Sequence, residues 1–222
     1  MAQSFGSCPH ILALANWHRF LSGCRTSLAG LSGCTPKDAP PSPPVSPRPS
    51  QNRREVPTTP RLLLRPWQPA DRDSLVALNA DPAVMRHFPA LMSAADTDAM
   101  LERIHAHFAQ HGYGLWAAEL RATGECIGYI GLNIPRFQLP FSPCVEIGWR
   151  LAAAHWNQGL ATEGALAALD YGFQTLGLRE IVSFTTPANL PSRRVMEKIG
   201  MTHNPAEDFD HPALPEAPYA LT

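Results

Sequence analysis

The chain lacks several features that would place it in a specialised class of protein. Its 18 Lys and Arg are balanced by 19 Asp and Glu, so no excess of positive charge favours direct nucleic-acid binding. No apolar run reaches the roughly 18 residues that a transmembrane helix needs, and no membrane partner is expected. The sequence also has neither a lysine-containing phosphate-binding loop nor a GxGxxG turn, which argues against a nucleotide-binding α/β protein.

Cysteine is scarce and follows no zinc or CxxC spacing. Cys126 and Cys144 lie in apolar surroundings and are expected to be reduced core thiols, with Cys144 as a nucleophile the minor alternative. Reduced thiols favour a reducing compartment, and we expect a cytoplasmic protein. His105, His107 and His111 lie close in sequence, but no carboxylate or cysteine pattern completes a metal site. Solvated surface histidines and no metal are expected.

Proline is concentrated between residues 35 and 60, where nine of the 23 prolines occur. Such a run has few backbone donors and is typical of an extended linker. The apolar stretch Ile11–Ala15 is short and has no preceding basic residue, so a targeting signal is less favoured than a disordered leader. Residues 1–57 are therefore expected to be a disordered leader and Pro-rich linker, and residues 58–222 a single globular domain.

The globular part alternates between the two hydrophobic periodicities. Patterning and turn residues predict six strands, at 61–67, 113–120, 125–134, 144–152, 179–185 and 201–203. Helices are predicted from residue 69 and at 93–112, 159–176 and 189–199. This order predicts an α/β (α+β) fold around a mixed sheet, with no internal repeat.

The segment Ala154–Leu166 carries the clearest signal for a binding site. A predicted strand ends, a turn containing Gly159 follows, and a long helix starts at once. Gly159 and the small Ala161 permit close approach of a ligand to the backbone, and Thr162 adds a hydroxyl. Unpaired amides at a helix start favour a phosphate or pyrophosphate, although an ordinary strand-to-helix turn has the same local pattern.

Four separate pieces of the chain resemble the GNAT superfamily of N-acetyltransferases, in particular the branch that contains the ribosomal-protein N-terminal (RimJ/RimL-like) enzymes. His155–Glu163 (HWNQGLATE) resembles the acyl-CoA signature of that branch, although Trp156 departs from the superfamily's usual Arg or Gln. The other pieces follow in the family's order and resemble its opening strand, its Glu-Ile-Gly-Tyr strand and its Asn-x-x-Ser…Glu-Lys-x-Gly-Phe segment: Arg61–Arg65, Glu146–Trp149 and Asn189–Met201.

The resemblance implies a fold and a co-substrate. It implies a GNAT-like fold in which the parallel strands 144–152 and 179–185 splay apart to admit the pantetheine arm of acetyl-CoA. Amides of the turn are implied to hold the pyrophosphate, namely those of Gln158, Gly159, Leu160, Ala161 and Thr162. Backbone groups of three strand residues are implied to pair with the pantetheine, namely Arg150, Leu151 and Ala152. Asn189 is implied to contact the cofactor or bound water.

Acetyl transfer to an amine needs an unprotonated nucleophile, a polarised carbonyl and a proton for the leaving thiolate. Glu146 interrupts an apolar strand and is the first candidate for the base, the alternative being a structural carboxylate paired with Arg150 or a backbone amide. By resemblance, Ser192 protonates the thiolate, with Asn189 beside it, although both residues also suit helix capping. The backbone amide of Leu151 is the implied oxyanion donor.

Several features of the acceptor side stay open. The candidates for a wall of the acceptor pocket are Phe137, Phe141, Trp149 and the segment 208–212. The alternatives are ordinary packing for the aromatic residues and a plain loop for the segment. The closing C-terminal strand that the family normally has is expected to be short or missing, which would expose a sheet edge. The resemblance thus implies an N-acetyltransferase acting by direct transfer on a protein N-terminus or a small-molecule amine. The alternative is a non-catalytic acyl-CoA-binding module with a degenerate fold.

Overall fold

The computed structural model describes residues 9–16 and 56–210. In these ranges eight strands form one sheet with the order β2-β3-β4-β5-β6-β1-β7, and β8 pairs with β1. Neighbouring strands are antiparallel except β5 and β6, so the predicted mixed sheet is confirmed. The strands are β1 (Pro9–Asn16), β2 (Leu62–Arg65), β3 (Leu115–Leu120), β4 (Cys126–Asn133), β5 (Glu146–Leu151), β6 (Glu180–Thr185), β7 (Thr202–His203) and β8 (Phe209–Asp210).

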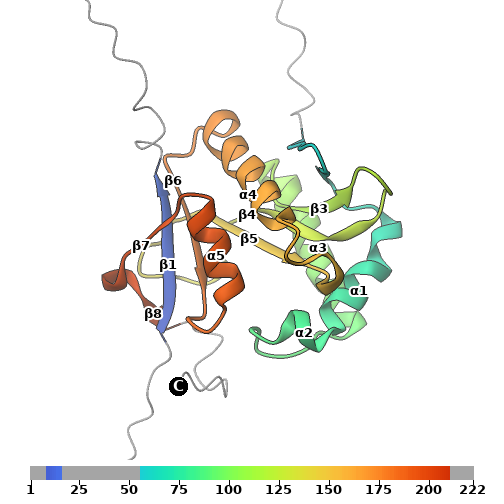
Figure 1. Ribbon diagram of the computed structural model, residues 1–222, viewed down its shortest axis with the longest axis horizontal. Helices are drawn as coiled ribbons and strands as arrows, with labels where there is room; N and C mark the ends of the chain where they lie inside the picture. The colour runs from blue at the N-terminus through green and yellow to red at the C-terminus, as the bar shows by residue number, and fades with distance from the viewer. Residues whose placement is uncertain (1–8, 17–55, 211–222) are drawn as a thin grey trace, which may run out of the picture. The chain divides into compact units, whose positions relative to one another are not determined.

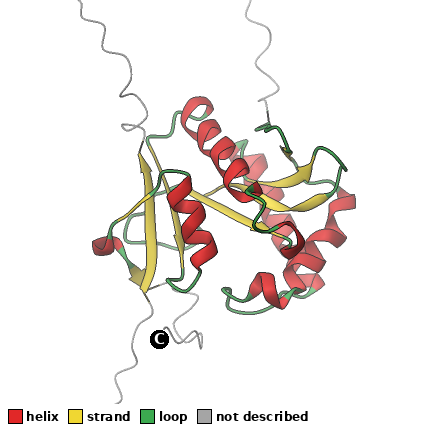
Figure 2. Ribbon diagram, viewed as in Figure 1, coloured by secondary structure: helices red, strands yellow, loops and turns green. Residues whose placement is uncertain are grey.

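The helices follow the predicted positions, with one addition. They are α1 (Arg72–Ala80), α2 (Pro82–Met85), α3 (Ala94–His111), α4 (Leu160–Asp170) and α5 (Leu190–Lys198), shown in Figures 1 and 2. The four-residue α2 is too short for periodicity to reveal. After α4 the chain continues as a π-helical turn, Tyr171–Thr175, where the Leu176 N–H donates to the Tyr171 carbonyl at 3.1 Å. Among the described helices none is both long and apolar enough to cross a bilayer.

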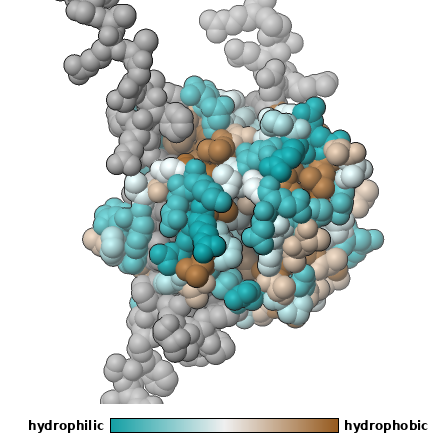
Figure 3. Space-filling view, in the orientation of Figure 1, coloured by the Kyte–Doolittle hydropathy of each residue, from teal (hydrophilic) through white to brown (hydrophobic). Residues whose placement is uncertain are grey.

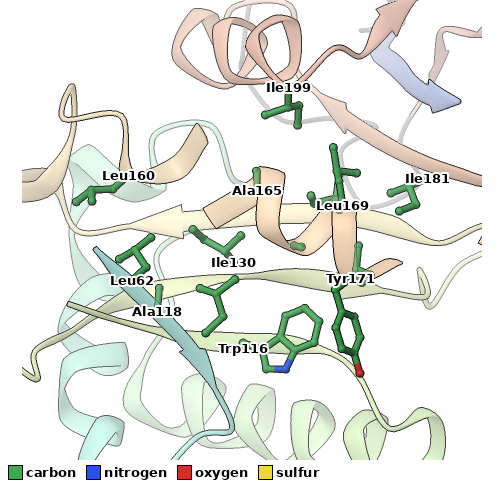
Figure 4. Packing of buried hydrophobic residues seen from close by; sticks show 14 of the residues in the cluster. Leu62, Trp116, Ala118, Ile130, Leu160, Ala165, Leu169, Tyr171, Ile181 and Ile199 are labelled. Carbon is green, nitrogen blue, oxygen red and sulfur yellow. The ribbon is translucent and has the colours of Figure 1, made fainter. Parts of the chain in front are cut away.

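Helices cover both faces of the sheet, because strand side chains alternate between them. On one face, Trp116 and Ile130 pack against Ala165 and Leu169 of α4 (Figure 4). Ile147 belongs to the same cluster. On the other face, side chains of the neighbouring positions pack with α1, α2 and α3, among them Ala117, Tyr129, Leu75, Leu78 and Ile104. The outward side of α5 is hydrophilic (Figure 3). The architecture is therefore three-layered.

The N-terminal segment differs from the sequence expectation. Residues 9–16, expected to belong to a disordered leader, form β1, which pairs with β6 from Ile11↔Thr185 to Asn16↔Glu180 and lies between β6 and β7 (Figure 1). The physical reason is the open edge. β7 and β8 have two residues each, and β1 pairs its backbone groups with the edge that β6 would otherwise expose. The remaining leader, the linker to residue 55 and residues 211–222 lie outside the described residues.

Candidate active site

The two parallel strands meet at one point and then diverge. Within the described chain β5 and β6 share one pair, Glu146↔Val182, and the Val182 N–H donates to the Val145 carbonyl at 2.9 Å. Beyond that pair β5 runs away from β6 (Figure 1). A cavity of about 220 Å³ opens there, lined by β5, β6, the first turn of α5 and the loop between α2 and α3. The splay that the resemblance implies is thus present.

Glu146 lies at the inner end of this cavity. Burial alone raises the pKa of its carboxyl group to about 8, and no hydrogen bond or ion pair offsets that cost among the described residues. The alternative of a structural carboxylate paired with Arg150 is therefore wrong, because Arg150 bonds Asn79 instead. A carboxyl group of raised pKa facing a cavity is suited to exchanging protons near neutral pH.

Three polar side chains line the same cavity as Glu146, from the segment after β6 and the start of α5. Asn189 caps α5, its Oδ1 accepting from the Ser192 N–H at 3.4 Å, while its Nδ2 donates to Thr185 Oγ1 at 2.9 Å. Asn189 and Ser192 both line the cavity, so capping is compatible with a role in the site. Thr186, which also lines it, has a buried hydroxyl with no partner in the described chain. This hydroxyl is therefore available to a hydrogen-bonding group in the cavity.

The predicted turn leads directly into α4. Asn157 and Gly159 both have positive φ, 59° and 78°, and no side chain caps the helix at Gly159. The first helical bond runs from the Glu163 N–H to the Gly159 carbonyl at 3.0 Å, so the amides of 160–162 precede it. These unpaired donors at the positive end of the helix dipole fit a phosphate group.

Arg61 adds a positive charge that sequence reasoning did not place in the site. Its Nη1 donates to the Gln158 carbonyl at 2.9 Å, and its Nη2 lies 2.6 Å from Glu163 Oε2. Burial alone would raise the pKa of Glu163, but hydrogen bonds from Thr59 and Arg61 hold it below its usual value. The Arg61 side chain is 49% exposed, so donors stay available beside the turn. Arg61 and Gln158 are 97 residues apart in the sequence, so no local sequence pattern predicts their contact.

The backbone at the end of β5 is only partly available for a ligand. The Ala152 N–H donates to Ile127 on β4, so by antiparallel alternation the Leu151 N–H points toward the gap beside β6. The Leu151 carbonyl already accepts from the Trp156 indole at 2.7 Å. The Leu151 amide is therefore a free donor on this side of the strand. The Arg150 guanidinium lies elsewhere, beneath the loop between α2 and α3.

Some candidates lie outside the cavity. Trp149 lines it, but Phe137 packs on Phe184, while Phe141 packs on Phe209 of the segment 208–212. His107 is not a solvated histidine as expected. Its Nδ1 donates to the Tyr113 carbonyl and its Nε2 accepts from the Ile134 N–H, and burial lowers its pKa. Its role in the fold is therefore to join α3 to the segments that precede β3 and follow β4.

Comparison with known proteins gives the family. The acetyltransferase (GNAT) domain family matches residues 61–202. The uncharacterized protein YkkB of Bacillus subtilis is 35% identical over 147 residues, 66% of this chain and 84% of that protein. The FsC-acetyl coenzyme A-N(2)-transacetylase of Aspergillus fumigatus is 32% identical over 154 residues, 65% of this chain and 64% of that protein. The crystal structure of an Agrobacterium tumefaciens acetyltransferase matches with a TM-score of 0.60 and 31% identity, over 78% of this chain and 96% of that one. The predicted resemblance is confirmed, and this chain belongs to the GNAT family of acetyltransferases.

Proposed function

We propose that the protein transfers the acetyl group of acetyl-CoA directly to a primary amine in the cavity between β5 and β6. The observation that carries the proposal is Glu146, a half-buried carboxyl group without a partner in the described chain, at the point where the two strands part. The amine is either a protein N-terminus or a small molecule.

Acetyl-CoA fits the donors present at this end of the sheet. The uncapped start of α4 offers the amides of Leu160, Ala161 and Thr162 to the pyrophosphate, and the turn residues Gln158 and Gly159 precede them. The exposed Arg61 guanidinium stands beside that turn. The open edge of Arg150, Leu151 and Ala152 suits the pantetheine arm, with the Leu151 amide as its donor. In the Aspergillus relative, acetyl coenzyme A is part of the protein's name.

The residues around the cavity divide the proton transfers. Glu146, ionised, accepts a proton from the substrate ammonium group, directly or through a water, and so generates the nucleophilic amine. Its nitrogen forms the new N–C bond as the C–S bond breaks, and the Leu151 N–H is placed to donate to the carbonyl oxygen. The Ser192 hydroxyl donates its proton to the leaving CoA thiolate. The attacking nitrogen loses a proton when the amide forms, and this proton returns to the Ser192 oxygen. Asn189 fixes Ser192 through its cap.

Binding and turnover together test this proposal. The full chain should bind acetyl-CoA in calorimetry and release free thiol when it is offered primary amines, including ribosomal-protein N-terminal peptides. Binding without turnover across a broad panel would favour a non-catalytic acyl-CoA-binding module. Absence of binding would overturn the assignment of the cavity.

A further inference from the structure

Arg150 is a buried cation beside the part of the cavity that is lined by Phe88, Tyr129 and Gly148. We call this part the acceptor end of the cavity. The residue is 8% exposed, and its Nη1 donates to Asn79 Oδ1 at the end of α1. Its guanidinium carbon lies 3.9 Å from the centroid of the Phe88 ring and 5.3 Å from that of Tyr129. No carboxylate pairs with it in the described chain. Stacking on aromatic faces is therefore its main electrostatic compensation.

The same contacts fix the loop that carries Phe88. The Met92 N–H donates to the Asn79 carbonyl at 3.0 Å, so the far end of the loop is tied to α1. The Asn79 Nδ2 donates to Thr97 Oγ1 at 3.2 Å, which ties α1 to α3. Phe88, in the middle of the loop, lines the cavity and covers the Arg150 guanidinium. Arg150 thus fixes the position of one wall of the cavity.

The floor of the acceptor end includes Gly148 of β5, which has no side chain. Glu146, Gly148 and Arg150 alternate along one face of β5, and Gly148 pairs with Gly131 on β4. A Cβ placed on Gly148 would meet no atom within 4 Å, so this position opens into free space. The hollow therefore extends from the Glu146 carboxyl group toward the Tyr129 ring, beside the pinned Phe88.

The size and charge of the cavity restrict the amine. Its volume of about 220 Å³ must hold the acetyl thioester as well as the acceptor. Pockets that enclose drug-sized ligands measure about 300–1,000 Å³. Among the described residues that line it, Glu146 is the only acidic one, and the neighbouring walls are aromatic. One carboxylate neutralises one ammonium group, which leaves the further charges of a polyamine unpaired.

We propose that the acceptor is a small amine with one positive charge and an apolar or aromatic body, and that Arg150 selects it by holding Phe88 over the acceptor end of the cavity. The inference rests on the proposed acetyltransferase function and names its substrate class. A peptide is expected to be the poorer substrate, because the backbone that follows its N-terminus would bring further polar groups to a small cavity whose walls include Phe88, Tyr129 and Trp149. Arg150 acts here as a positioning residue, through Phe88.

A three-way competition tests the substrate class. The full chain is assayed for thiol release with phenethylamine, with spermine and with a serine-initiated peptide that has a blocked C-terminus. We expect kcat/KM for phenethylamine to exceed both others by about tenfold or more. Better use of the peptide or of spermine would overturn the inference but leave the acetyltransferase proposal intact. Acetyl-CoA binding with no turnover of any amine would instead contradict the acetyltransferase proposal.

Variants of the pinned loop test the role of Arg150. Phe88→Ala and Arg150→Met should each raise KM for phenethylamine about tenfold and reduce its preference over the peptide, and Arg150→Lys should restore part of that preference. Leu91→Ala is the matched control, since Leu91 lies in the same loop but is 51% exposed and does not line the cavity. A parallel loss of kcat with all three acceptors, at unchanged preference, would mean that Arg150 only supports the fold.

Discussion

Glu146 on β5 and Val182 on β6 form the parallel pair that joins the two parts of the sheet in the described chain. β6 therefore has little support from β5, and most of its ladder comes from β1, through six residue pairs. The cavity wall formed by Ser183 to Thr186 thus depends on a strand that lies far away in the sequence.

Deletion of residues 1–16 should lower the free energy of unfolding and weaken acetyl-CoA binding. The deletion removes the ladder that holds β6, which leaves an open edge and an unsupported cavity wall. Deletion of residues 1–8 is the control, because it keeps β1. Thermal melting and calorimetry are the measurements. Equal melting temperatures and affinities for the two truncations would contradict the role assigned to β1.

Glu146 should make stability depend on pH. Burial raises the pKa of its carboxyl group from about 4.5 to about 8, so between these values the folded state keeps a proton that the unfolded state has lost. The contribution of the protonated Glu146 side chain to the free energy of unfolding is full below pH 4.5. It is lost as the pH rises through about 8, at up to about 1.4 kcal/mol per pH unit.

Urea unfolding of the wild type and Glu146→Gln at pH 6.5 and pH 8.5 measures this effect. The wild type should lose more stability than the variant across that interval. Because the other titrating groups are common to both proteins, their contributions cancel in the difference. Parallel pH dependences would show that the carboxyl group titrates normally.

Gly148→Val should leave the fold intact but impair turnover. The new side chain would point into the hollow beside Glu146, where a Cβ meets no protein atom within 4 Å. We expect an unchanged melting temperature and a KM for the amine raised about tenfold or more, because the substrate loses that volume. Unimpaired turnover would mean that the amine does not occupy this part of the cavity.

Arg61→Ala should raise the dissociation constant of acetyl-CoA about tenfold, with a weaker salt dependence than the wild type has. The change also removes the partner of Glu163, so Glu163→Gln is the companion variant. It breaks the ion pair but keeps the guanidinium, and its affinity should be retained. If both variants bind acetyl-CoA equally poorly, Arg61 acts only by supporting the turn.

Much of this architecture could be predicted from the sequence, because its signals are local. The strand containing Glu146, the glycine turn at 159 and the Asn189 cap each have a pattern within a few residues. Their order along the chain was enough to indicate the family. The direct contact of Asn189 with Ser192 is equally local, at three residues' separation.

The missed features that shape the site are long-range. β1 pairs with a strand about 170 residues away, and the Arg61 contact with Gln158 spans 97 residues. Arg150 was predicted to act through its backbone or, alternatively, to pair its side chain with Glu146, whereas that side chain bonds Asn79, 71 residues earlier. Such partners are chosen by the packing of the sheet, which no short pattern encodes.

Glu146→Gln, assayed for both binding and transfer, tests the central claim most directly. Glutamine keeps the shape of the side chain but cannot accept a proton from the amine. Acetyl-CoA affinity should stay within about twofold while kcat/KM falls about a hundredfold. The wild-type rate should rise with pH toward an apparent pKa near 8, and the variant should lack that dependence. Undiminished turnover by Glu146→Gln, with the same pH profile, would contradict the assignment of the proton acceptor.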